Sequence, residues 1–141
     1  MRKSFRATRS RHLAIMGLSF SALFGGEEKV LAHHTYAMFD GEHTKVVSGT
    51  VAKLEWKNPH VFVWVYVPNQ NTPGGYDLWA FENGSPSVLG AIGWSLKALK
   101  MGEPITVEYW PLKNGDKGGH FEKATLSGGR SLRGAGGPGR F

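Results

Sequence analysis

The sequence contains no cysteine among its 141 residues. This absence excludes disulfide frameworks, thiolate zinc sites, iron–sulfur clusters and cysteine nucleophiles. No apolar run reaches the roughly 18 residues that an ordinary transmembrane helix needs. The sequence also lacks a nucleophile elbow, a P-loop and a dinucleotide fingerprint, so an enzyme is the less favoured class. A mass of 15.4 kDa with 40% hydrophobic residues corresponds to one globular domain.

Residues 1–32 have the layout of a secretory signal peptide. Five Lys and Arg residues come before residue 12, a mostly apolar stretch runs from Leu13 to Phe24, and Val30-Leu31-Ala32 offers a cleavage site. We therefore expect cleavage after Ala32 and a periplasmic or secreted protein. The mature form would carry no transmembrane helix.

Most of the net positive charge, four of the six units, lies in this leader. Removing residues 1–32 removes six Lys and Arg and two Glu, which lowers the formal net charge from +6 to about +2. A mature chain with so little net charge has no basic stripe, so we expect no nucleic-acid partner. The glycine-rich segment 127–141, which contains three Arg residues, is expected to be a flexible tail.

The segment between leader and tail, residues 33–126, is expected to be mainly β. Alternating and β-branched runs predict five strands: Val46–Trp56, His60–Val67, Tyr76–Glu82, Ile105–Leu112 and His120–Leu126. Ser85-Pro86 predicts a short helix, and Ser95 predicts a second one through Leu99. Five strands with a helical link between the third and fourth predict a small OB-like barrel, with an open β-sandwich as the alternative.

Several segments together resemble a known family. They are HHTYAMFD at 33–40, GTVAKLEWKNPHVFVWVYV at 49–67, ENGSPSVL at 82–89, and LKALKMGEPITVEYWPLKNGDKGG at 96–119. In these the chain is similar to a family of small exported bacterial proteins catalogued as a domain of unknown function. The W-x-NPH segment is the most specific part of the resemblance. The resemblance implies a periplasmic location and a compact β-rich domain, and it supplies no activity or catalytic residue.

Cleavage after Ala32 would make His33 and His34 the first two residues of the mature chain. The terminal amine and the imidazole of His33 could chelate copper as a histidine brace, completed by a distant imidazole. Alternatively, the amine, one amide nitrogen and His34 would bind Cu(II), as any X-His terminus does. The candidates for a further ligand are His43, His60 and His120, with Met38 as a soft ligand for Cu(I). The competing interpretation is that both histidines are polar residues at a frayed terminus.

The segment Trp56-Lys57-Asn58-Pro59-His60 would form the turn between the first two strands. OB barrels use such loops for ligands, so Trp56, Asn58 and His60 are candidate ligand-binding residues, and His60 is also a candidate metal ligand. A purely structural turn, held by Asn58 and Pro59, is the competing interpretation.

Phe62, Trp64 and Tyr66 alternate with valines along the second strand and so share one face. On an exposed face they would be a stacking platform for sugar rings or aromatic ligands, with Trp64 as the binding residue. Because a strand that is apolar on both faces is normally buried, we expect instead that this face belongs to the core.

Carboxylates are scattered over different predicted elements, and spacing alone does not pair them; they are Asp40, Glu42, Glu82, Glu108 and Glu122. The sequence therefore predicts an exported, non-enzymatic binding or accessory module, with copper held by the N-terminal histidines. The first alternative is a barrel that binds a small ligand or another periplasmic protein without metal. A small copper oxidase or monooxygenase is the more remote one.

Overall fold

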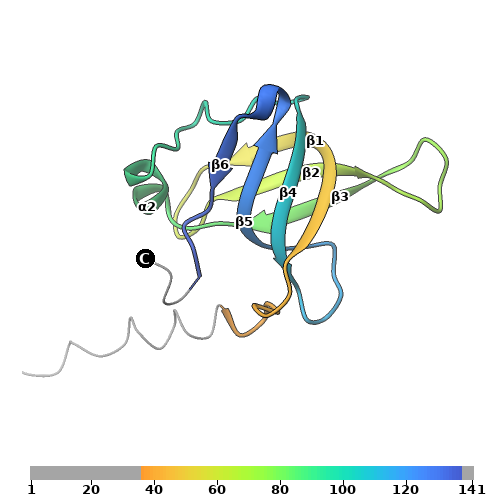
Figure 1. The fold of residues 1–141 in the computed structure, drawn as a ribbon, viewed down its shortest axis with the longest axis horizontal. Coiled ribbons are helices and arrows are strands. Elements are labelled where there is room, and N and C mark those ends of the chain that lie inside the picture. The colour runs from red at the N-terminus through yellow and green to blue at the C-terminus, as the bar shows by residue number, and fades with distance from the viewer. Residues whose placement is uncertain (1–35, 138–141) are drawn as a thin grey trace, which may run out of the picture.

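Figure 1 shows the computed structural model, which describes residues 36–137. The elements in chain order are β1 (Lys45–Glu55), β2 (Phe62–Pro68), β3 (Tyr76–Glu82), α2 (Pro86–Ala91), β4 (Pro104–Pro111), β5 (Gly118–Leu126), the 3₁₀ turn η1 (Ser127–Gly129) and β6 (Ser131–Arg133). The first five strands lie within two residues of the ranges predicted from the sequence. β6 lies inside the range expected to be a flexible tail, because Ser131–Arg133 pairs with the exposed edge of β5.

The strands form one sheet in the order β3-β2-β1-β4-β5-β6. A parallel pairing between β3 and β5 joins the two ends of the five-strand set, and all the other pairings are antiparallel. The five strands therefore close into a barrel, with β6 outside it on β5 (Figure 1). The OB-like barrel is confirmed, and the open sandwich is excluded.

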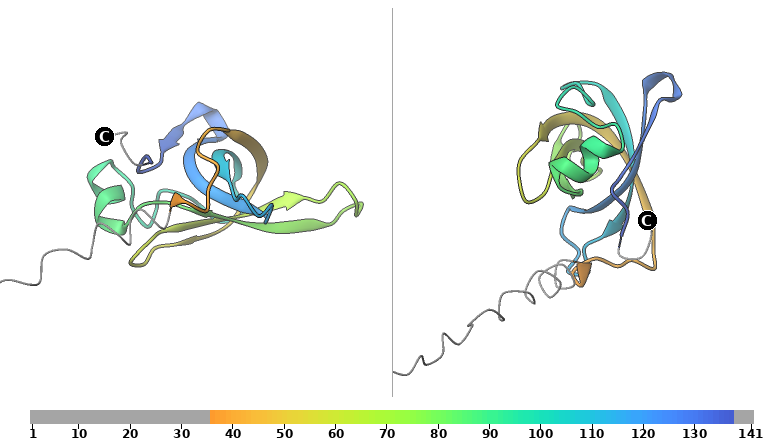
Figure 2. Two further views of the ribbon diagram at one scale, coloured as in Figure 1. Left: turned by 90° about the horizontal axis from the view of Figure 1, so that it is seen from below. Right: turned by 90° about the vertical axis from the view of Figure 1, so that its left-hand side faces the viewer.

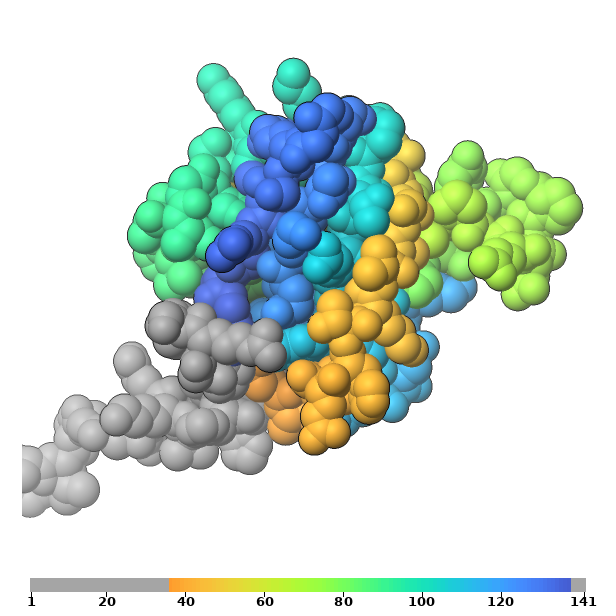
Figure 3. Space-filling model, viewed as in Figure 1, coloured from red at the N-terminus to blue at the C-terminus, as the bar shows by residue number. Residues whose placement is uncertain are grey.

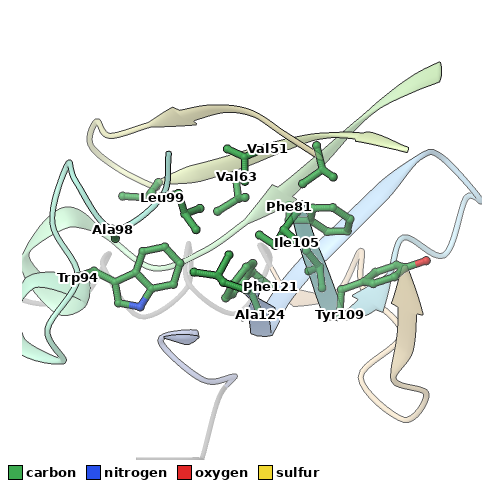
Figure 4. Packing of buried hydrophobic residues seen from close by; sticks show 14 of the residues in the cluster. Val51, Val63, Phe81, Trp94, Ala98, Leu99, Ile105, Tyr109, Phe121 and Ala124 are labelled. Atoms are coloured by element: carbon green, nitrogen blue, oxygen red, sulfur yellow. The ribbon is translucent and has the colours of Figure 1, made fainter. Parts of the chain in front are cut away.

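The core fills the barrel and continues under the helical link (Figure 4). The valines of β2 point inward and are buried, and Phe81 packs edge-on against Tyr109 with 5.0 Å between the ring centroids. Ser85 caps α2 by accepting a hydrogen bond from the Val88 amide, and Leu89 inserts from this helix into the core. Figure 2 shows α2 lying across one end of the barrel.

Two local predictions differ from the structure. The second short helix, from Ser95 to Leu99, is instead a series of turns, because Gly93 with φ of +91° ends the helical path and Ala98 and Leu99 turn into the core. The register of β1 also shifts between Val51 and Lys53, a β-bulge. As a result Val51 and Leu54 both face the core, which strict alternation would not allow.

The chain on either side of the barrel packs against its outer wall. Before β1, Phe39 forms a β-bridge with Leu112, and the Asp40 amide donates to the Pro111 carbonyl at 2.9 Å. After β6, the Gly134 amide donates to the Glu122 carbonyl at 2.8 Å. In Figure 3 the residues around Phe39 lie at the same end of the molecule as the last described residues, while the β2–β3 hairpin extends away from the body.

Among residues 36–137, α2 is the only α-helix of several residues, and no helix there has the length and apolar character to span a bilayer.

Candidate functional site

His60 lies in the loop between β1 and β2, as the sequence predicted. The residue after it, Val61, exchanges hydrogen bonds with the two residues that follow β3: its amide donates to the Gly84 carbonyl at 3.0 Å and its carbonyl accepts from the Asn83 amide at 2.8 Å. These bonds hold His60 beside the last residue of β3, Glu82. The Nδ1 atom of His60 donates to Oε1 of Glu82 at 2.7 Å.

His120 reaches the same place from β5. In the parallel β3–β5 pairing that closes the barrel, Glu82 is the register partner of His120. The imidazole of His120 points away from the barrel core, yet it is only 2% exposed, because the rings of Tyr36, Phe39 and Trp110 surround it at centroid distances of 5.1, 5.6 and 5.2 Å. Closure of the barrel therefore brings together two histidines that are 60 residues apart.

The two ring nitrogens of His120 have different surroundings. The backbone of Gly136 hydrogen-bonds the imidazole, and Nε2 has no hydrogen-bond partner among the described residues. Nδ1 is thus the nitrogen that donates to Gly136, which leaves a lone pair on Nε2. In His60 too, Nδ1 is held by an acceptor, the Glu82 carboxylate. Both imidazoles are therefore oriented with Nε2 available as a ligand.

Burial keeps the His120 ring neutral. It lowers the pKa of His120 to about 4, His60 nearby lowers that pKa further, and the hydrogen bond to Gly136 acts in the opposite direction. Burial also raises the pKa of Glu82, and the attraction of His60 partly offsets this effect. At neutral pH the uncharged His120 can bind a metal ion without first losing a proton.

Two further side chains complete the arrangement. Oε1 of Glu122 lies 3.5 Å from Nε2 of His120. The hydroxyl of Tyr36 donates to the Gly136 carbonyl at 3.3 Å, and its pKa is raised by burial and then by the charges of Glu82 and Glu122. We call these five residues, Tyr36, His60, Glu82, His120 and Glu122, the histidine cluster.

The aromatic face of β2 lies next to this cluster, on the outside of the barrel. The expectation that it belongs to the core is wrong: the valines fill the interior, Phe62 and Trp64 are half-buried on the outer face, and Tyr66 is exposed. The polar Lys53 and Glu55 stand opposite Trp64 and Phe62 on β1, and directly paired residues share a face. That polar pairing was the sequence signal that the core interpretation missed.

Contacts fix the orientation of Trp64. Its Nε1 atom donates to Oε2 of Glu55 at 3.0 Å, the Nζ atom of Lys53 lies 5.9 Å from its ring centroid, and its ring lies 6.3 Å from that of Phe62. Lys53 and Lys57 both form ion pairs with Glu55.

The other predicted site residues lie elsewhere or outside the described residues. Trp56 packs against the core, and Asn58 is exposed in the β1–β2 loop. His43 pairs with Asp40 through Nδ1 at 2.8 Å, and Met38 is largely exposed. His33 and His34 lie outside the described residues, so the N-terminal copper chelate remains a prediction.

Within residues 36–137 no group of three or more His, Asp or Glu side chains is arranged so that it could hold a metal ion by itself. His60 and His120 thus offer two nitrogens of a site that needs at least one ligand from outside this range or from solvent. The sequence had named His60 for such a role and His120 as a candidate partner, whereas Glu82, Glu122 and Tyr36 emerge only from the fold.

Comparison with known proteins yields one match. A family model described as "Family of unknown function (DUF6152)" matches residues 22–122. No curated protein and no solved structure shows significant similarity to the chain.

Proposed function

We propose that this protein is an exported binding module that takes up a copper ion at the histidine cluster. The chain belongs to the family of unknown function DUF6152. The observation that carries the proposal is that both His60 and His120 have one ring nitrogen held by an acceptor. In each, an acceptor holds Nδ1 and leaves Nε2 available. Histidines that ligate metals have this arrangement almost invariably, because the acceptor on Nδ1 fixes the tautomer and raises the basicity of the ligand nitrogen.

Copper is the favoured ion because the ligands at hand are nitrogens. Imidazole suits copper well, and Cu²⁺ binds most tightly among the divalent first-row metals. The N-terminal histidines would add to this set. His34 precedes Tyr36 by two residues in the sequence. The ring of Tyr36 lies against that of His120.

Export is part of the proposal, because only cleavage after Ala32 would give His33 a free amine. The basic start, the apolar stretch and the Val30-Leu31-Ala32 site support that cleavage. In the uncleaved precursor the amine is an amide, which removes the chelate but leaves His60 and His120 unchanged.

Isothermal titration with Cu(II) tests the proposal on protein that begins at His33. We expect one ion per chain with submicromolar affinity, and at least a tenfold loss in His120→Gln and in His60→Gln. Acetylating the amine of His33 should weaken binding further, because an acetylated terminus cannot form the terminal chelate. His43→Gln is the matched control, because His43 pairs with Asp40 instead of the cluster. Equal binding by the starting protein, the acetylated protein and both cluster variants would overturn the proposal.

A second candidate function rests on the outward aromatic face of β2. A fixed Trp64 beside Phe62, with Lys53 and Glu55 at its edge, is suited to stacking against a sugar or aromatic ring. Under this alternative the protein binds its ligand without metal. Ligand-induced shifts of the Trp64 indole signal in NMR spectra of chelator-treated protein would favour it, whereas shifts that require copper would favour the first proposal.

A further inference from the structure

The position of Glu122 is set by a second β-bulge. Along the β4–β5 pairing, Glu108 faces Lys123 and Tyr109 faces Phe121, so Glu122 is the extra residue of β5. Bulges of this kind redirect a side chain and occur more often than expected next to functional sites. Here the bulge lies two residues after His120, and the Glu122 carbonyl at the same point accepts from Gly134.

The distance between Glu122 and His120 fits two ligands of one ion. Nitrogen and carboxylate ligands lie about 2.0–2.2 Å from an ion of this size, so two of them on one ion are roughly 3–3.6 Å apart. Oε1 of Glu122 and Nε2 of His120 are 3.5 Å apart. His120 is only 2% exposed, and its Nε2 atom has no hydrogen-bond partner among the described residues. The site therefore has a buried ring nitrogen close to the Glu122 carboxylate.

We propose that Glu122 supplies a carboxylate oxygen ligand beside His120, so that the cluster binds Cu(II) in preference to Cu(I). This inference rests on the proposed function. Carboxylate oxygens suit harder ions, while Cu(I) prefers thiolate, thioether and imidazole ligands. A negative charge in the ligand set also stabilises the more highly charged ion. The module would therefore bind oxidised copper more tightly than reduced copper.

The alternative role for Glu122 is purely structural, as a carboxylate that supports the His120 side chain or the Tyr36 hydroxyl. A structural role would lower the affinity for both oxidation states together. A ligand role lowers the affinity for Cu(II) and leaves that for Cu(I) nearly unchanged, which raises the reduction potential of the bound ion.

The experiment compares Glu122→Gln with the starting protein, both beginning at His33. Affinities for Cu(II) and Cu(I) are measured by competition with chelators specific for each state, and the potential is measured by voltammetry. We expect Glu122→Gln to bind Cu(II) 10- to 100-fold more weakly with Cu(I) affinity within threefold. The potential should rise by about 59 mV for each tenfold loss, the relation for a one-electron couple. Glu108→Gln, which breaks an ion pair with Lys123 on the adjoining strands, is the matched control and should change neither value.

The outcomes separate this inference from the proposed function. If the starting protein binds copper and Glu122→Gln has the same potential, the inference fails while the proposed function stands. If Glu122→Gln loses both ions equally, its role is structural and the inference again fails. Failure of the starting protein to bind Cu(II) overturns both. Glu122→Asp guards against misfolding of the amide variant, since it keeps a carboxylate and should retain a lower potential than Glu122→Gln.

Discussion

Glu82 on β3 is the register partner of His120 on β5, and its side chain accepts a hydrogen bond from His60. One residue thus joins the seam that closes the barrel to the loop between β1 and β2. Because β3 and β5 meet only when the barrel is complete, the two histidines come together only in the folded protein. Metal binding at this site would consequently stabilise the folded state, since the unfolded chain has no such pair.

Glu82→Gln should weaken Cu(II) binding about 10- to 100-fold, the usual cost of removing an outer carboxylate from a ligating histidine. An amide can still hydrogen-bond to His60 but carries no charge to raise its basicity. Isothermal titration measures the effect, and circular dichroism confirms that the fold is retained. Unchanged affinity would mean that Glu82 does not act on the metal through His60.

The barrel could be predicted from the sequence because its strands show their period directly. Tyr76–Glu82 coincides with the observed β3, and the turn at Asn58-Pro59 separates the first two strands as expected. β6 could not be predicted in this way. Ser131–Arg133 is too short to show a period, and it forms a strand because the edge of β5 is available to it.

The site was predicted only in part. His60 stands in the loop where the sequence put it, but its partnership with Glu82 depends on tertiary contacts. In an OB-like barrel the third and fifth strands are neighbours, so their pairing could be predicted from the strand order. The register of that pairing could not be predicted, because no local turn sets the register of parallel strands that are distant in sequence. This register places Glu82 beside His120.

Leu89→Ala should destabilise the fold by about 2–5 kcal/mol, the usual cost of emptying a buried leucine site. Leu89 is 0% exposed at the end of the barrel that α2 covers. Val88→Ala, in the same turn of α2 at a side chain that is 40% exposed, is the control and should change stability by no more than about 0.5 kcal/mol. Urea denaturation followed by tryptophan fluorescence measures both. Similar values for the two variants would contradict the packing of Leu89.

Glu55→Gln should make the stability of the fold less dependent on pH between about pH 2 and pH 7. Hydrogen bonds from Lys57, Lys53 and Trp64 lower the pKa of Glu55 to about 2. A carboxylate whose pKa is lowered by folding stabilises the folded state above its ordinary pKa, near 4.5, and loses that contribution as the pH falls toward 2. The starting protein should therefore be the more stable at pH 7, and the difference should disappear by about pH 2.

Chemical denaturation at pH 7, 4 and 2 measures this convergence. Glu42→Gln, at an exposed position before β1, is the control and should follow the starting protein at every pH. A difference between Glu55→Gln and the starting protein that persists at pH 2 would show that the amide disturbs packing rather than charge.

Gly118→Ala should disrupt the seam between β3 and β5. At Gly118 φ is +144°, and an added Cβ would lie 2.1 Å from the Ala80 carbonyl oxygen, a backbone atom that cannot move aside. Gly115 also has a positive φ, +82°, in a turn where an added Cβ meets nothing within 4 Å, so Gly115→Ala carries only a conformational cost, about 1–2 kcal/mol. We expect Gly118→Ala to lose clearly more stability than Gly115→Ala in thermal denaturation. It should also lose Cu(II) affinity, because the pairing of Ala80 with Gly118 leads directly to that of Glu82 with His120. Full Cu(II) affinity in a folded Gly118→Ala protein would separate the copper site from the seam, and Glu82 and His120 would then not need their register to act together.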